Sequence, residues 1–333
     1  MERIRICDIA RELGVSTATV SNVIHGKTEK VSPETFQSVQ ALLEERQYIP
    51  SMAGILLAQN SSRIIGVVFH DHEKYEGKPL EDPFFASSLN ALSREIEKNG
   101  YFLMVKTART TDEIITMASM WNMEGLVLLG FCEQDYQTLR DSMRIPFVIY
   151  DGNNEAPDRY YDLVLDDFDG GYQAGQYLSA LGHKVVLCLS DNLEHLDLKR
   201  IRGFQAAFGE TAVHLLPVVQ SVRMKFYESI LEELRHYSAA FVVSDFYAVE
   251  LVGFLQSHGI RVPEDLSVVG FDDAPISQWC TPMLTTIRQD GELRAKLAME
   301  KLRQLRSGEA RGGTVKIPVQ LVIRESCTEY TGI

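Results

Sequence analysis

Polar side chains that could hold a small molecule recur directly after runs of apolar, strand-forming residues. Asp151, Ser244 and Asp272 each end or follow such a run, Phe84 comes after the first run, and Arg200 lies near the start of a predicted helix. Ligands of parallel α/β sheets bind beyond the carboxyl ends of the strands. Charged groups pair with hydroxyls while aromatic rings stack on C–H faces, so this set suits a sugar or a nucleoside.

Each of these residues also has a plainer interpretation. Phe84 could belong to the core, Asp151 could cap a turn, and Asp273 is expected to fix its loop rather than touch a ligand. The aspartates at 166, 167 and 169 could do acid–base work as a group, but acids are equally at home at a helix N-terminus.

The chain lacks the patterns that usually accompany catalysis or metal binding. It has no G-x-G-x-x-G, Walker, G-x-S-x-G or H-E-x-x-H motif, and its eight histidines form no ligand-spaced set. Its five cysteines are scattered, as reduced thiols of a cytosolic protein would be. We expect no catalytic residue, no cofactor and no metal.

The first residues of the chain predict a small helical unit. Apolar residues recur at helical spacing over 6–13, 17–24 and 33–46, with Gly14 and Ser16 as a stop and a start signal between the first two. Two helices joined so tightly are typical of a helix-turn-helix, whose second helix enters a major groove.

The second of these helices supplies the candidate DNA contacts. Asn22 could pair with adenine, and Ala18 or the methyl group of Thr17 could touch a thymine methyl. Hydroxyls, ring nitrogens and N–H groups at the helix edges suit phosphates; here these residues are Ser16, Thr19, Ser21 and His25. A three-helix cap or dimerisation module remains the alternative. Residues 1–62 hold six basic against seven acidic residues, without the basic excess usual in a DNA-binding headpiece.

After Arg63 the pattern changes to short β-branched runs that alternate with amphipathic helices. This alternation predicts an α/β core of two doubly wound parallel-sheet subdomains, like periplasmic binding proteins. We expect four regions along the chain: 1–49 as the headpiece, 50–62 as a hinge, 63–161 with 290–318 as the first subdomain, and 162–289 with 319–333 as the second.

Composition supports an intracellular location. The net charge of −13 does not suit a protein that coats nucleic acid, and no uncharged apolar run approaches membrane-spanning length. The residues from Met1 to Arg5 lack the apolar core of a signal peptide, so we expect a cytoplasmic protein.

Several motifs resemble the lactose-repressor (LacI/GalR) family of bacterial transcription regulators. They run in family order along nearly the whole chain: Ile6-Cys7-Asp8-Ile9-Ala10, Gly14 to Val23, Val31-Ser32-Pro33-Glu34-Thr35, Tyr48-Ile49-Pro50, Arg200 to Phe204, Val262 to Asp273, Thr281 to Ile287 and Val322 to Ser326. The resemblance implies a repressor that binds a pseudo-palindromic operator as a homodimer, through a hinge helix that presses Leu57 into the minor groove. Asn22 stands where the family usually has arginine, and Gly54 departs from the usual hinge pattern.

The resemblance also implies effector contacts at Phe84, Asp151, Arg200, Asp272, Ser244 and Trp279. A sugar or sugar derivative is the expected effector, and a nucleoside or a partner protein are alternatives. A solute-binding protein without a role in transcription would share the core fold but would need no headpiece.

Overall fold

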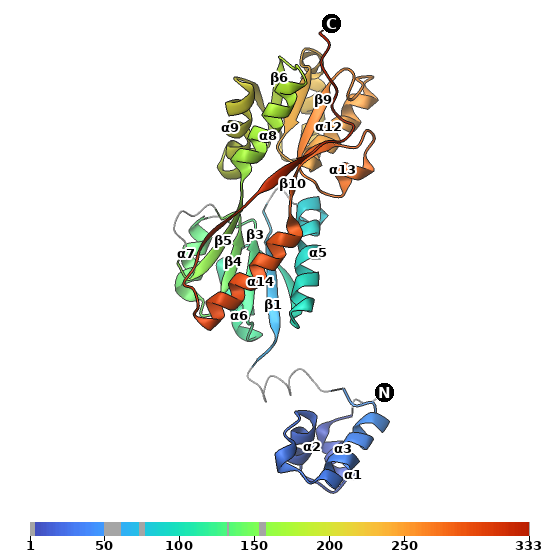
Figure 1. The fold of residues 1–333 in the computed structure, drawn as a ribbon, viewed down its shortest axis with the longest axis vertical. Helices are drawn as coiled ribbons and strands as arrows, with labels where there is room; N and C mark the ends of the chain where they lie inside the picture. Colours follow the sequence, from blue (N-terminus) through green and yellow to red (C-terminus); the bar gives the residue numbers. More distant parts are fainter. Residues whose placement is uncertain (1–3, 50–60, 73–76, 132, 153–157, 333) are drawn as a thin grey trace. The chain divides into compact units, whose positions relative to one another are not determined.

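The computed structural model describes residues 4–49, 61–72, 77–131, 133–152 and 158–332. The chain divides into two compact units, Met1–Ser62 and Arg63–Ile333 (Figure 1). Most of the predicted hinge, including Gly54 and Leu57, lies outside the described residues.

The first unit is helical. Its elements are α1 (Ile6–Glu12), α2 (Thr17–Ile24), the short 3-10 helix η1 (Thr28–Lys30) and α3 (Pro33–Glu45). Ser16 and Ser32 cap α2 and α3 by accepting backbone N–H bonds, and Gly14 has the left-handed φ of 64° that the turn after α1 requires. Six buried apolar residues form the core of this unit: Ile9, Ala10, Val20, Val23, Val39 and Leu42.

The second unit contains two six-stranded sheets. The first sheet is parallel throughout, in the order β11-β5-β4-β3-β1-β2. Its strands are β1 (Ile64–His70), β2 (Phe102–Ala108), β3 (Gly125–Leu129), β4 (Phe147–Tyr150), β5 (Tyr160–Leu165) and β11 (Gly313–Ile317).

Alternate strand residues bury opposite faces of the first sheet. Val67 and Val127 pack with α5 (Pro83–Lys98) and α14 (Gly291–Ser307), whereas the neighbouring residues in the strands pack with α6 (Thr111–Met120) and α7 (Glu133–Ser142). The short 3-10 helix η3 (Pro79–Glu81) leads into α5. Both faces are therefore covered, as a parallel sheet requires.

The second sheet has the order β12-β10-β9-β8-β6-β7. Its strands are β6 (Val186–Ser190), β7 (Ala212–Leu215), β8 (Ala239–Val242), β9 (Ser267–Asp272), β10 (Thr285–Gln289) and β12 (Val319–Val322), of which β12 is antiparallel to β10. Helices α8 (Asp167–Ala180) and α9 (His195–Phe208) cover one face. The other face is covered mainly by α10 (Gln220–Ser229), α11 (Leu231–Leu234) and α12 (Asp245–Ser257). The short α13 (Ile276–Trp279) follows β9.

The chain passes between the two sheets three times. It crosses after β5, again between β10 and α14, and again between β11 and β12 (Figure 1). β5 continues to Leu165, so the first sheet extends past residue 161, the end expected from the sequence pattern. The predicted fold class of a helical headpiece and two doubly wound subdomains is confirmed. No described helix has the length and apolar character needed to cross a membrane.

Candidate functional site

Helix α2 presents one polar, exposed face. Val20 and Val23 bury its opposite face, and Ser16 Oγ accepts the backbone N–H of Thr19 at 3.1 Å, which sets the start of the helix. Thr17 and Ala18 in the first turn are exposed. This is the geometry in which the N-terminal side chains of a second helix can reach base edges.

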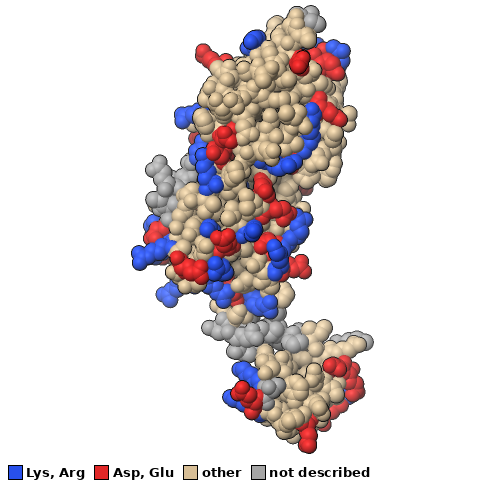
Figure 2. Space-filling model, in the orientation of Figure 1, with Lys and Arg blue, Asp and Glu red and all other residues tan. Residues whose placement is uncertain are grey.

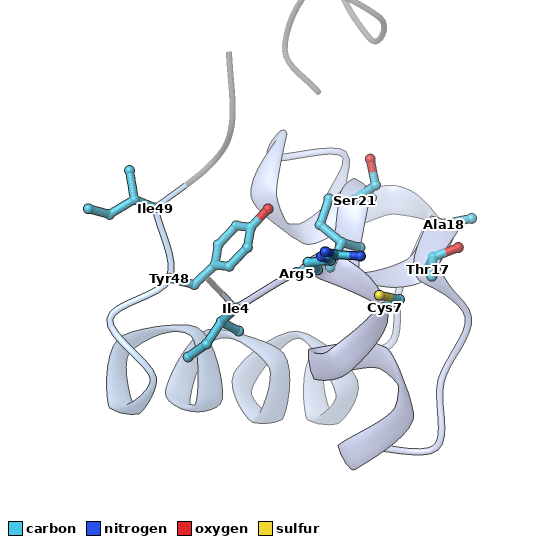
Figure 3. Close-up of a pocket in the computed structure, with 9 residues that line it drawn as sticks. Ile4, Arg5, Cys7, Thr17, Ala18, Ser21, Tyr48 and Ile49 are labelled. Atoms are coloured by element: carbon cyan, nitrogen blue, oxygen red, sulfur yellow. The ribbon is translucent and has the colours of Figure 1, made fainter. Parts of the chain in front are cut away.

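A groove with a volume of about 680 Å³ runs along this face. It is lined by Ile4, Arg5, Ile6, Cys7, Thr17, Ala18, Ser21, Tyr48 and Ile49. Figure 3 shows Arg5, Ser21, Ala18, Thr17 and Cys7 at one side of the groove, and Ile4, Tyr48 and Ile49 at the other. Among the described residues, the lining contains a guanidinium and hydroxyls but no carboxylate, so it suits a polyanion with exposed base edges.

Charge pairing explains why an acidic headpiece can still present such a groove. Glu12 is bound by Arg46 at 2.6 Å, while Asp8 accepts the backbone N–H of Arg5 and lies 3.6 Å from Arg11. These contacts partly neutralise both carboxylates. On the visible face of residues 63–333, acidic and basic side chains are interspersed without a basic stripe (Figure 2).

A second cluster of polar residues lies where the two sheets meet. Arg200 is buried, donates through Nε to Asp167 at 2.8 Å and through Nη1 to the carbonyl of Val243 at 2.7 Å. Its guanidinium carbon lies 3.8 Å from the centre of the Phe271 ring, and Nη1 is 3.9 Å from Asp272. Burial lowers the pKa of Arg200 but the surrounding aspartates raise it further, so the arginine stays charged.

Asp151 belongs to the same cluster through a second buried arginine. It follows β4 with a left-handed φ of 60°, and Arg294 Nη2 binds its carboxylate at 2.6 Å. The same Nη2 donates to the carbonyl of Leu163 at 2.6 Å, and the guanidinium lies 4.0 Å from the centre of the Tyr150 ring.

Asp272 is the third predicted contact in the cluster. Gln289 donates to its Oδ1 at 2.5 Å. Burial raises the pKa of Asp272 to about 7; Arg200 opposes this shift and the charge of Asp82 adds to it. A carboxyl group with such a pKa exchanges its proton near neutral pH, which is common at functional sites.

Comparisons with known proteins identify the family. Residues 5–51 match the model described as bacterial regulatory proteins, lacI family, and residues 176–327 match a periplasmic binding protein-like domain. The HTH-type transcriptional repressor PurR of Mannheimia succiniciproducens is 31% identical, over 96% of this chain and 98% of its own length. The chain belongs to the lacI family of bacterial regulatory proteins.

Two solved structures of regulators share the fold over nearly the full length of the chain. The lac repressor dimer bound to operator and the anti-inducer ONPF superposes with a TM-score of 0.83 at 24% identity, covering 98% of this chain and 100% of the repressor chain. The transcriptional regulator CelR, in complex with cellobiose, has a TM-score of 0.68 at 22% identity. The match covers 97% of this chain and 100% of the CelR chain. The resemblance inferred from the motifs is confirmed, and the chain is a DNA-binding transcription regulator.

Only some of the predicted DNA contacts of this lacI-family headpiece line the groove. Thr17, Ala18 and Ser21 line the groove, whereas Ser16 and Thr19 use their hydroxyls to pair with each other at 2.9 Å at the start of α2. His25 caps the end of α2 and Asn22 is half-buried; neither lines the groove. Leu57 lies outside the described residues.

The predicted effector contacts are only partly brought together. Asp151, Arg200 and Asp272 join the buried cluster. Ser244 caps α12, directly after the Val243 carbonyl that Arg200 binds. Phe84 is half-buried with its ring centre 5.8 Å from that of Phe85. Trp279 is 78% exposed on α13 and makes no ring contact with the cluster among the described residues.

Sequence reasoning missed several residues that the structure places in these sites. Arg5 and Cys7 line the groove, and Arg294, Asp167 and Gln289 belong to the cluster. One signal was available for Arg294. It stands in register with Ala298 and Leu302 on the apolar stripe of α14, where an arginine needs a buried partner. Asp273 binds Arg288 at 2.6 Å and also pairs with Arg324, so it fixes its loop as expected.

Proposed function

We propose that this protein is a repressor that binds a pseudo-palindromic operator as a homodimer in the cytoplasm, without enzymatic activity. A small molecule bound at the buried cluster between the two sheets sets its operator affinity. The observation that carries this proposal is that one chain holds both a groove beside α2, with no carboxylate among its described lining residues, and the cluster of Arg200, Asp151 and Asp272.

The chemistry of the cluster favours a sugar or sugar derivative as the effector. Guanidinium and carboxylate groups offer charge-assisted hydrogen bonds to hydroxyls, and the CelR structure carries cellobiose in a similar fold. A nucleoside would use the same groups, and a partner protein would leave the cluster without a ligand. Closure of the two subdomains around the ligand would bias the arrangement of the DNA-binding units, which is the coupling that allostery requires.

Deletion of residues 1–62 tests the DNA-binding half of the proposal. The remaining Arg63–Ile333 unit has its own cores, so we expect it to stay folded and to bind ligand, with no specific operator affinity left. Gel-shift titration of the full chain and the deletion variant on the same operator measures this. Specific binding by the deletion variant would rule out the headpiece as the DNA-binding unit.

Replacing Asp272 by alanine tests the regulatory half. We expect operator binding to survive while its response to ligand is lost, because the carboxylate lies in the cluster and not in the DNA-binding unit. Asp112→Ala, on the exposed first turn of α6, is the matched control. An unchanged response in the Asp272 variant would place the ligand elsewhere.

A further inference from the structure

Buried polar atoms without a partner concentrate in the cluster between the two sheets. In the described part of the chain, nine buried side-chain nitrogen or oxygen atoms have no hydrogen-bond partner, and five belong to this cluster. They are Tyr150 Oη, Asp167 Oδ2, Gln289 Oε1, Arg294 Nε and Arg294 Nη1. Folded proteins satisfy nearly all buried polar groups, so such a concentration indicates a place for a molecule from outside the chain.

Two of these residues complement each other. Asp167 uses Oδ1 for Arg200 and leaves Oδ2, an acceptor, unpaired. Arg294 uses Nη2 for Asp151 and Leu163 and leaves two donors unpaired. Both side chains are at least 98% buried, so neither is served by bulk solvent.

The two residues also come from different subdomains. Asp167 begins α8, which packs on the second sheet, and Arg294 lies in α14, which packs on the first. Burial raises the pKa of Asp167, and the charge of Arg294 partly opposes this rise, so the two charged groups interact. They nevertheless form no direct ion pair among the described residues. A group placed between them would have to donate to one and accept from the other.

A hydroxyl group does both at once. We propose that Asp167 and Arg294 form a subsite for a ligand hydroxyl, and that the effector is an uncharged polyhydroxylated compound rather than a phosphate or carboxylate. This inference rests on the proposed function, because it names the ligand class of the same regulatory site.

The charge of the cluster supports the exclusion of anions. Two arginines, Arg200 and Arg294, stand against a larger set of aspartates. The charge of Asp151 acts on Asp167, and the charges of Asp82 and Asp197 act on Asp272. An additional anion here would be desolvated and repelled by this excess of carboxylates. Neutral hydroxyls would instead satisfy the unpaired atoms without adding charge.

Calorimetric titration of the full chain tests the ligand class. The panel consists of neutral sugars, sugar alcohols and nucleosides, each measured beside its phosphate ester or its carboxylic acid. We expect at least one neutral compound to bind, and its charged counterpart to bind at least about tenfold more weakly. Equal or tighter binding of the charged member overturns the proposal. A panel in which no neutral compound binds also overturns it, because the unpaired atoms would then be served by ordered water only.

Two variants separate a ligand subsite from a structural role. Asp167→Asn keeps an oxygen that can accept from Arg200 but loses the negative charge and one acceptor. We expect neutral ligand to bind at least about tenfold more weakly. We also expect a smaller difference in affinity between the neutral ligand and its charged counterpart. Asp169→Asn in the same helix, where the carboxylate binds Gln173, is the matched control and should change neither. An equal loss for neutral and charged ligands would mean that Asp167 only positions Arg200.

Arg294→Lys keeps a positive charge near Asp151 but removes Nε and Nη1, so it should weaken the binding of neutral ligands. Thermal unfolding measures separately how much the altered contacts to Leu163 and Tyr150 destabilise the fold. Unchanged ligand affinity in this variant contradicts the subsite.

Operator gel shifts with the best neutral ligand then distinguish the two proposals. A chain that binds the ligand but whose operator affinity does not respond refutes the regulatory function and leaves the subsite standing. An operator affinity that responds only to anionic ligands supports the regulatory function and refutes the hydroxyl subsite.

Discussion

Two buried arginines hold in place the carboxylates of the cluster between the two sheets. Arg200 stacks on Phe271 and Arg294 stacks on Tyr150, so each guanidinium has an aromatic face on one side and carboxylates at its edge. Lysine has neither the flat face nor the planar, fixed arrangement of donors. The positions of the acidic groups therefore depend on arginine at both sites.

The raised pKa of Asp272 predicts a pH-dependent stability. Its carboxyl group has a higher pKa in the folded chain, about 7, than the ordinary 3.8, so folding favours the protonated form. The contribution of this group to stability is greatest below about pH 4 and is lost as the pH rises through 7. Asp272→Asn mimics the protonated form and should lack this loss.

Urea unfolding of both proteins between pH 4 and pH 8 measures the effect. The free energy of unfolding of Asp272→Asn should rise relative to the unmodified chain by up to about 1.4 kcal/mol per pH unit. Asp112→Asn, which is exposed, is the control and should show no such trend. Parallel curves for Asp272→Asn and the unmodified chain would contradict the raised pKa.

At the scale of elements, the crossing of α8 and α9 brings Asp167 to Arg200. Gly171 and Gly175 on α8 and Gly203 on α9 leave room for the two backbones to approach. A Cβ on Gly203 would collide with the carbonyl oxygen of Phe168. Because Asp167 and Arg200 lie about one helical turn from Gly171 and Gly203, respectively, the close crossing fixes the ion pair between them.

Gly203→Ala should therefore weaken both the fold and the site. We expect a loss of about 2 kcal/mol or more in the free energy of unfolding, because a backbone carbonyl cannot move aside as a flexible side chain can. The affinity for the ligand should also fall, because the same crossing positions Asp167 and Arg200. Thermal unfolding and ligand titration measure the two effects.

Gly253→Ala in α12 is the matched control for this substitution. No atom outside the neighbouring residues and the helix backbone lies within 4 Å of the added Cβ, so alanine should stabilise α12 by roughly 1 kcal/mol. If both variants behaved alike, the close crossing of α8 and α9 would not be the cause.

For the molecule as a whole, the division into two units predicts separable stability and function. The first unit rests on a small core, in which Val39 is fully buried in α3. The cores of Arg63–Ile333 share no residue with it. Damage to one unit should therefore leave the fold of the other intact.

Val39→Ala tests this separation. The substitution should cost the headpiece about 2 kcal/mol and weaken operator binding, while ligand affinity stays unchanged. Gln40→Ala, an exposed neighbour on the same helix, is the control. Operator gel shifts and ligand calorimetry on the same samples give both readouts, and a fall in ligand affinity would show that the two units do not fold independently.

Local signals in the sequence were sufficient for the headpiece and for most strands. Ser16, Ser32 and Gly14 act on their own neighbours, so their effect on α2, α3 and the turn is readable without tertiary contacts. The strands β5 and β10 were not predicted. β5 follows residues 153–157 and contains the polar Asp162, which is buried and accepts the N–H of Gly152, a partner that the pattern does not reveal.

The sequence alone thus determined the family, the helix-turn-helix with the groove residues Thr17, Ala18 and Ser21 on α2, and three members of the buried cluster. Only the tertiary structure decided that Asp167 and Arg294 belong to that cluster. Asp167 looked like an ordinary residue of a helix N-terminus, and Arg294 lies 127 positions further along the chain, in α14. They meet because the chain crosses between the sheets before α8 and again before α14. Residue spacing carries no record of such crossings, since they depend on how whole sheets pack.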